Sequence, residues 1–226
     1  MNAKKQTATQ HLFTNKQLRT LLVPIMVEQL LSSLMGTADT MMVSNVGSAA
    51  ISAVSLVDAI NILVIQALSA LAAGGAILCS QYLGSQNLKK AKCSAEQVLF
   101  VMLVLSCSLS LLCLIFRFPL LRLIFGTVDT DVMANSQIYF FFTLLSFPFI
   151  GLYDAGASIL RAQNNTKGPM TISILSNFLN IGGNAILIFV FGMGVAGAAI
   201  ATVLSQLASC VVGFSYMRRR YELLRF

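Results

Sequence analysis

Long apolar segments alternate with short polar ones along the chain, and this pattern predicts a membrane protein. A helix needs roughly 20 mainly apolar residues to cross the hydrocarbon core of a bilayer. Six segments meet this requirement, at residues 21–43, 51–82, 97–116, 132–160, 168–191 and 194–217. The last two divide an uncharged stretch, 168–217, at the turn-forming sequence Phe191-Gly192-Met193-Gly194. We therefore predict an all-α, polytopic fold of six transmembrane helices (21–217), between a polar N-terminus (1–20) and a basic tail (218–226).

Composition supports this class, because 57% of the residues are hydrophobic and 10% are charged. A soluble domain carries about 25% charged residues, so soluble enzymes are excluded. The net charge of +7 is typical of nucleic-acid binding, but the positions of the basic residues indicate another cause. Thirteen of the 15 lie on one side of the predicted membrane: Lys4, Lys5, Lys16, Arg19, Lys89, Lys90, Lys92, Arg161, Lys167, Arg218, Arg219, Arg220 and Arg225. The positive-inside rule then places both termini in the cytoplasm of a cell-membrane protein, with no nucleic-acid partner.

The residue types used in catalysis and metal binding are sparse. The single histidine, His11, lies in the polar N-terminus, and the five cysteines form no C-x-x-C pair. We therefore expect no enzyme activity, no resident metal and no cofactor.

Four acidic residues fall inside predicted spans, where a carboxylate costs a few kcal/mol and usually faces a protein interior or a water-filled cavity. They are Glu28, Asp39, Asp58 and Asp154. Glu28 and Asp39 are eleven residues apart, about three helical turns, so they share one face of the first span with Ser32 and Met35. Pro24 lies either in the first turns of this span, where proline is tolerated, or further inside, where it allows a bend.

The fifth span carries an uncharged polar stripe that consists of Ser173, Asn177, Asn180 and Asn184. In hydrocarbon such amides must find partners, either on a neighbouring helix or in a hydrated cavity. For Asn177 both interpretations stay open.

Three segments resemble the multidrug and toxic compound extrusion (MATE) transporters. They are PIMVEQLLSSLMGTADTMMVSNVGSAAISAVSLV (24–57), LRAQNNTKGPM (160–170) and NIGGNAILIFVFGMGVAGAAIATVLSQ (180–206). The resemblance covers nearly all of the chain from Leu21 onward. It extends over the N-terminal half of the family, whose members have twelve spans in two six-helix lobes.

The resemblance implies an efflux antiporter in which Na⁺ or H⁺ moves inward while organic cations move out. It makes Asp39 the central group of a coupling-ion or proton site, with Na⁺ as the one metal ion to consider there. By position, it adds Asn180, Asn184 and Thr202 as partners of Asp39. Some members have an aspartate where this chain has Asn184, so the chain has one carboxylate where they have two. The residues assigned to the substrate cavity or to the hinge are Pro24, Glu28, Ser32, Met35, Tyr139 and Asn177.

Cation-coupled antiport is thus the leading hypothesis, because a buried carboxylate can hold a proton, Na⁺ or a cationic substrate but hardly two at once. One alternative is a lipid-linked oligosaccharide flippase of the same superfamily, whose anionic substrates would require Arg or Lys in the cavity. The spans carry none except near their ends. Another alternative is a non-transporting lobe, truncated or structural, in which the tail 218–226 begins an interlobe linker. The expected partners are membrane lipids, a small organic cation, and a second six-helix lobe or another copy of the chain.

Overall fold

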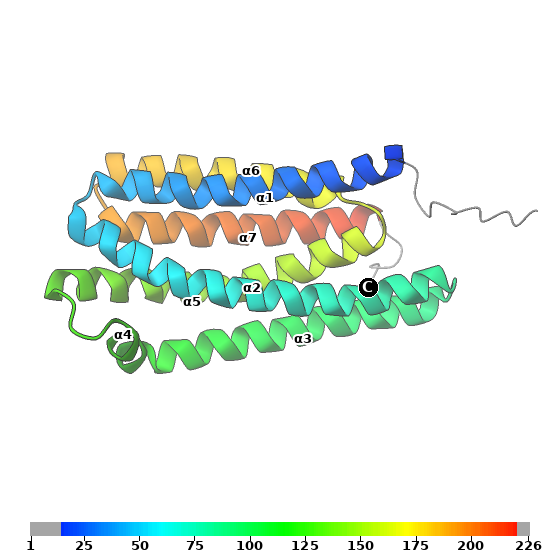
Figure 1. Ribbon diagram of the computed structural model, residues 1–226, viewed down its shortest axis with the longest axis horizontal. Coiled ribbons are helices and arrows are strands. Elements are labelled where there is room, and N and C mark those ends of the chain that lie inside the picture. The colour runs from blue at the N-terminus through cyan, green and yellow to red at the C-terminus, as the bar shows by residue number, and fades with distance from the viewer. Residues whose placement is uncertain (1–14, 221–226) are drawn as a thin grey trace, which may run out of the picture.

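The computed structural model describes residues 15–220, and over these residues it consists of helices joined by short turns (Figure 1). The elements are α1 (Asn15–Ser44), α2 (Ser48–Gly84), α3 (Leu88–Ile115), α4 (Arg117–Phe125), α5 (Thr130–Ala162), α6 (Lys167–Asn184), the π-helical segment η1 (Ala185–Val190) and α7 (Gly194–Arg220). Six helical stretches are long and apolar enough to cross a membrane. The all-α class and the six spans predicted from the sequence are confirmed. Most of the polar N-terminus and of the basic tail lies outside the described residues.

Two elements differ from a simple series of spans. The short helix α4 lies where α3 meets α5, at the same end of the bundle as the turn that leads into α7 (Figure 1). The span that begins with α6 changes to a π-helix immediately after Asn184. The turn into α7 contains Gly192 at φ 64° and Gly194 at φ 54°, a backbone conformation that glycine adopts without strain.

Helix α5 forms the centre of the bundle and packs against α2, α3 and α7. Phe140, Leu144 and Phe147 are among its fully buried side chains. These apolar side chains, together with Val54 and Val57 of α2, form the core of the lobe.

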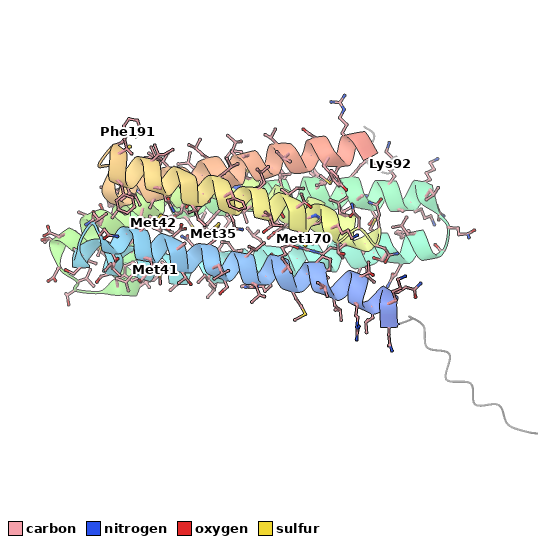
Figure 2. The ribbon with its side chains drawn as sticks, turned by 90° about the horizontal axis from the view of Figure 1, so that it is seen from above. Met35, Met41, Met42, Lys92, Met170 and Phe191 are labelled. Carbon is pink, nitrogen blue, oxygen red and sulfur yellow. The ribbon has the colours of Figure 1, made fainter. Side chains whose placement is uncertain are left out.

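Helix α1 lies at the edge of the bundle, where its main neighbour is α6 (Figure 1). Its buried residues are Pro24, Asp39 and Val43. Met41 is 66% exposed, whereas its neighbour Met42 packs against the core from the other side of the helix (Figure 2). Among the six membrane-crossing helices of the described residues, the helix that carries the predicted ion site therefore has the smallest buried share.

Candidate ion and substrate site

Asp39 lies near the C-terminal end of α1 and is 6% exposed. The side-chain amide of Asn184, at the last position of α6 before the π-helix, donates a hydrogen bond to Oδ1 of Asp39. A buried carboxylate at a helix–helix contact needs such a donor, because little water reaches it. This contact joins α1 to α6.

The interaction continues along α6 into α7. Nδ2 of Asn184 lies 3.3 Å from Oδ1 of Asn180, and Nδ2 of Asn180 lies 3.2 Å from Oγ1 of Thr202. The Thr202 hydroxyl in turn donates to the carbonyl oxygen of Ala198 at 3.1 Å. The structure thus places the four residues assigned to the coupling-ion site in one continuous chain.

The hydrogen-bonded series Asp39–Asn184–Asn180–Thr202 leaves some acceptor oxygens without donors. Asn180 and Asn184 are 0% exposed, and Oδ1 of Asn184 is a buried oxygen with no hydrogen-bond partner among the described residues. Within the described residues, no hydrogen bond reaches Oδ2 of Asp39. A proton or a small cation is the kind of species that satisfies such a surplus of oxygens.

Asp39 and Thr202 line a cavity of about 670 Å³, within the size range of small-molecule sites. Ser32, Met35 and Tyr139, which were assigned to the substrate cavity, also line it. Among the described residues that line this cavity there is no lysine or arginine.

The same cavity contains a second carboxylate, Asp58 of α2, to which the sequence analysis gave no role. The Tyr139 hydroxyl donates to Oδ1 of Asp58 at 3.1 Å, and Nδ2 of Asn61 lies 3.3 Å from the same oxygen. The charge of Asp58 within an apolar span was the available signal, but its neighbours on α5 could not be read from the sequence.

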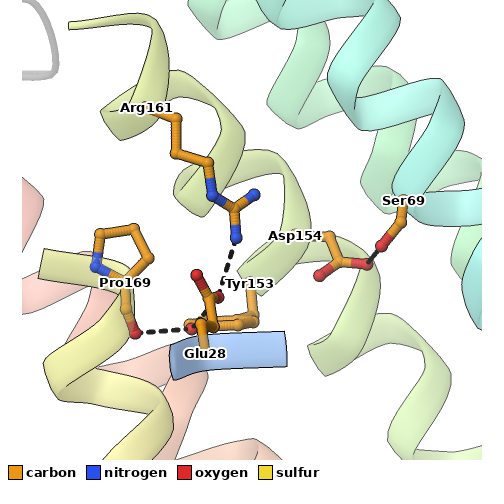
Figure 3. Close-up of polar contacts among 6 residues, drawn as sticks. All are labelled: Glu28, Ser69, Tyr153, Asp154, Arg161 and Pro169. Carbon is orange, nitrogen blue, oxygen red and sulfur yellow. Dashed lines mark hydrogen bonds and ion pairs between the residues drawn. The ribbon is translucent and has the colours of Figure 1, made fainter. Parts of the chain in front are cut away.

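A smaller cavity of about 430 Å³ lies closer to the N-terminal end of α1 and shares Ser32 and Met35 with the larger one. Glu28 lines it and forms an ion pair of 2.8 Å with Arg161 of α5 (Figure 3). The Tyr153 hydroxyl lies 3.4 Å from Oε1 of Glu28 and 3.1 Å from the carbonyl oxygen of Pro169. Glu28 is therefore a paired carboxylate, and the sequence analysis did not identify Arg161 as its partner.

Two further assigned residues take different positions. Asn177 lines the smaller cavity, but its amide donates to the carbonyl oxygen of Ser173 on the same helix rather than to a neighbouring helix. Pro24 lies inside α1, beyond its first two turns. Proline has no N–H to donate to the carbonyl of Thr20, and the Thr166 hydroxyl donates to that carbonyl at 3.4 Å.

The sequence matches the family model described as MatE over residues 24–186. "Uncharacterized transporter YisQ" of Bacillus subtilis (strain 168) is 31% identical, and the match covers 88% of this chain and 44% of that protein. "Probable multidrug resistance protein YoeA" of the same organism is 30% identical, over 91% of this chain and 45% of that protein.

A solved structure, the outward-facing conformation of a multidrug resistance MATE family transporter of the MOP superfamily, is also similar. It matches with a TM-score of 0.84 and 26% identity, over 92% of this chain and 46% of that chain. The chain thus spans less than half the length of the relatives described here.

Proposed function

This chain belongs to the MatE family, and from that premise we propose that it is the N-terminal half of an antiporter. The transporter exports organic cations across the cell membrane in exchange for Na⁺ or H⁺. The observation that carries this proposal is the buried contact between Asp39 and Asn184, which lies between two helices and leaves acceptor oxygens unsatisfied beside a cavity.

The contact suits a coupling ion because it can exist in two states. With Asp39 ionised, the Asn184 amide stabilises the carboxylate, and the free oxygens of both residues support a role in binding Na⁺. With Asp39 protonated or bound to Na⁺, the carboxylate no longer depends on the Asn184 donor. Occupation of the site therefore changes the interaction between α1 and α6.

A cationic substrate is favoured over an anionic one by the charge of the larger cavity. Its described lining includes Asp39 and Asp58 and no basic side chain. Arg161 lines the smaller cavity and is neutralised by Glu28. An oligosaccharide flippase would need exposed cationic groups where this chain has carboxylates.

The proposal includes a second six-helix lobe as partner and cytoplasmic termini. Large apolar side chains such as Leu30 and Leu34 of α1 are exposed in the isolated lobe, so this face suits contact with lipid or with another lobe. Lys92 lies at the end of the bundle opposite Phe191 (Figure 2). This arrangement supports the charge asymmetry on which the cytoplasmic orientation rests.

The test is replacement of Asp39 by Asn in this chain assembled with its second six-helix lobe and reconstituted into liposomes, with ethidium as the transported cation. We expect wild-type protein to move ethidium against an inwardly directed Na⁺ or H⁺ gradient. Reversal of the gradient should reverse the flux. Asp39→Asn should lower gradient-driven flux by at least tenfold, because it removes the group that holds the ion.

The matched control is Asp131→Asn, the same chemical change in the first turn of α5, at a residue that lines neither cavity. It should transport like the wild type. Equal gradient-driven flux in Asp39→Asn and wild type would rule out the proposed role of Asp39.

A further inference from the structure

The larger cavity is lined by two carboxylates, Asp39 and Asp58, that differ in solvent exposure. Asp39 is buried at the contact between α1 and α6, whereas Asp58 on α2 is partly exposed. Asp39 is therefore accessible to a proton or a small ion, while Asp58 is accessible to a bulkier group.

The hydrogen bonds of Asp58 leave one side of its carboxylate free. Both of its donors, the Tyr139 hydroxyl and the Asn61 amide, converge on Oδ1. Within the described residues no hydrogen bond reaches Oδ2. The two donors fix the orientation of the carboxylate and leave its second oxygen for a ligand.

An independent sign of a missing ligand comes from Asn61. This side chain lines the cavity and is 7% exposed, and its Oδ1 is a buried oxygen without a hydrogen-bond donor. A buried acceptor without a donor costs about 1–3 kcal/mol, so native structures keep few of them. Asp58 and Asn61 together thus offer acceptor oxygens from two successive polar positions of α2.

Three hydroxyl groups around this cavity donate to carbonyl oxygens of their own helices and not to Asp58 or Asn61. Thr143 and Ser146 of α5 donate to the carbonyl oxygens of Phe140 and Thr143 on their own helix, and Thr40 of α1 donates to Gly36. Their hydroxyl hydrogens are therefore engaged, and the cavity wall remains rich in acceptors. A ligand that brings its own hydrogen-bond donors or a positive charge would satisfy the free oxygens of Asp58 and Asn61.

We propose that Asp58, oriented by Tyr139 and supported by Asn61, binds the protonated amine of an organic cation, separately from the coupling ion at Asp39. Ile62, Ile65, Phe147 and Ile150 supply the apolar wall for the body of the same ligand. The inference rests on the proposed function in so far as that function makes the cavity a substrate site. A cation at Asp39 repels a cation at Asp58, so binding at either site weakens binding at the other.

The experiment measures binding of two fluorescent probes to the chain in nanodiscs. Dansylcadaverine carries a primary amine that is protonated at neutral pH, and N-acetyl-dansylcadaverine has the same body without the charge. Wild-type protein should bind the amine at least tenfold more tightly than the acetylated probe, as expected for a hydrogen bond to a charged group. Asp58→Asn should abolish this ratio while its affinity for the acetylated probe stays that of the wild type, which shows that the cavity is intact.

The matched control is Asp154→Asn, which removes a carboxylate that lines the smaller cavity and accepts a hydrogen bond from Ser69 at 2.5 Å (Figure 3). It should keep the tenfold ratio. An unchanged ratio in Asp58→Asn, an equal loss in Asp154→Asn, or no discrimination by the wild type would each overturn the inference. Failure of the proposed function would appear elsewhere: Asp39→Asn would retain the effect of Na⁺ or pH on amine binding.

Discussion

Replacing Asn184 with alanine tests whether the buried chain of side chains holds α1 against α6. The change removes the donor to Asp39 and the donor to Asn180, and it leaves both buried acceptors without that donor. The matched change is Asn177→Ala on the same helix, where the amide is 7% exposed and donates to the carbonyl of Ser173. Both variants lose the same side-chain volume, so their packing losses are comparable.

The two losses differ because of the charge on the acceptor. A hydrogen bond between membrane helices contributes on average about 0.6 kcal/mol, whereas a hydrogen bond to a charged group contributes about 1.5–3 kcal/mol. The Ser173 carbonyl is a neutral acceptor within the same helix, so loss of the Asn177 donor should lower the free energy of unfolding by no more than the value for a hydrogen bond between neutral groups. With Asp39 ionised, Asn184→Ala should lower the free energy of unfolding by about 2 kcal/mol more than Asn177→Ala, roughly a 30-fold difference in the equilibrium constant.

Reversible unfolding in mixed micelles with increasing dodecyl sulfate, followed by far-UV circular dichroism, measures these free energies. A double-mutant cycle with Asp39→Asn isolates the contribution of the pair, and we expect a coupling energy of at least about 1 kcal/mol. Equal losses in the two alanine variants, together with a coupling energy below about 0.5 kcal/mol, would refute the conclusion that Asn184 stabilises an ionised Asp39.

Three further predictions test other contacts. Thr202→Val removes a hydroxyl from the ion site and should abolish any rise in melting temperature caused by Na⁺. Thr202→Ser keeps a hydroxyl and should keep this rise; loss of the rise in both variants would contradict a role for the hydroxyl. Gly197→Ala should lower the free energy of unfolding by about 1–3 kcal/mol in the same dodecyl sulfate titration, because its Cβ would lie 3.1 Å from backbone atoms of η1. Gly182→Ala, with nothing within 4 Å, should be neutral or slightly stabilising. Arg161→Met should lower the free energy of unfolding by about 1–2 kcal/mol, a figure reduced for the partial exposure of Arg161, because it leaves the Glu28 carboxylate unpaired. Adding Glu28→Gln should recover part of this loss, and no recovery would mean that the two residues are not coupled.

The six long helices could be predicted from the sequence because a bilayer requires each span to be apolar over its whole length. The same argument does not detect α4, since nine residues cannot cross a membrane and Arg117 and Arg122 interrupt their apolar pattern. It does not detect η1 either, because the sequence AILIFV is equally compatible with an α-helix. This segment contacts α7, and such a contact between helices cannot be read from the sequence.

The candidate site, too, could be predicted from the sequence only in part. A stripe on one helix shows which residues share a face, and a polar residue within a span shows that this face needs a partner. Neither shows the rotation and depth of the neighbouring helices, which decide which side chains meet. Hence Glu28 was recognisable as a polar position, whereas its ion pair with Arg161 crosses from α1 to α5 and depends on the arrangement of the whole bundle. The contact of Asp58 with Tyr139 is likewise a property of the α2–α5 interface.

The position of the carboxylate on α1 connects the proposed chemistry to motion. Helix α1 has a smaller buried share than the other five membrane-crossing helices among the described residues, and the hydrogen bond between Asp39 and Asn184 joins it to α6. A cation that neutralises the Asp39 carboxylate weakens its hydrogen bond with Asn184, because the acceptor is no longer charged. The loss, about 1–2 kcal/mol, is large for a helix with so few buried residues. Pro24 gives the same helix an interrupted backbone hydrogen bond between this contact and its N-terminal end. Under the proposed function, ion binding therefore acts on the membrane-crossing helix with the smallest buried share among the described residues.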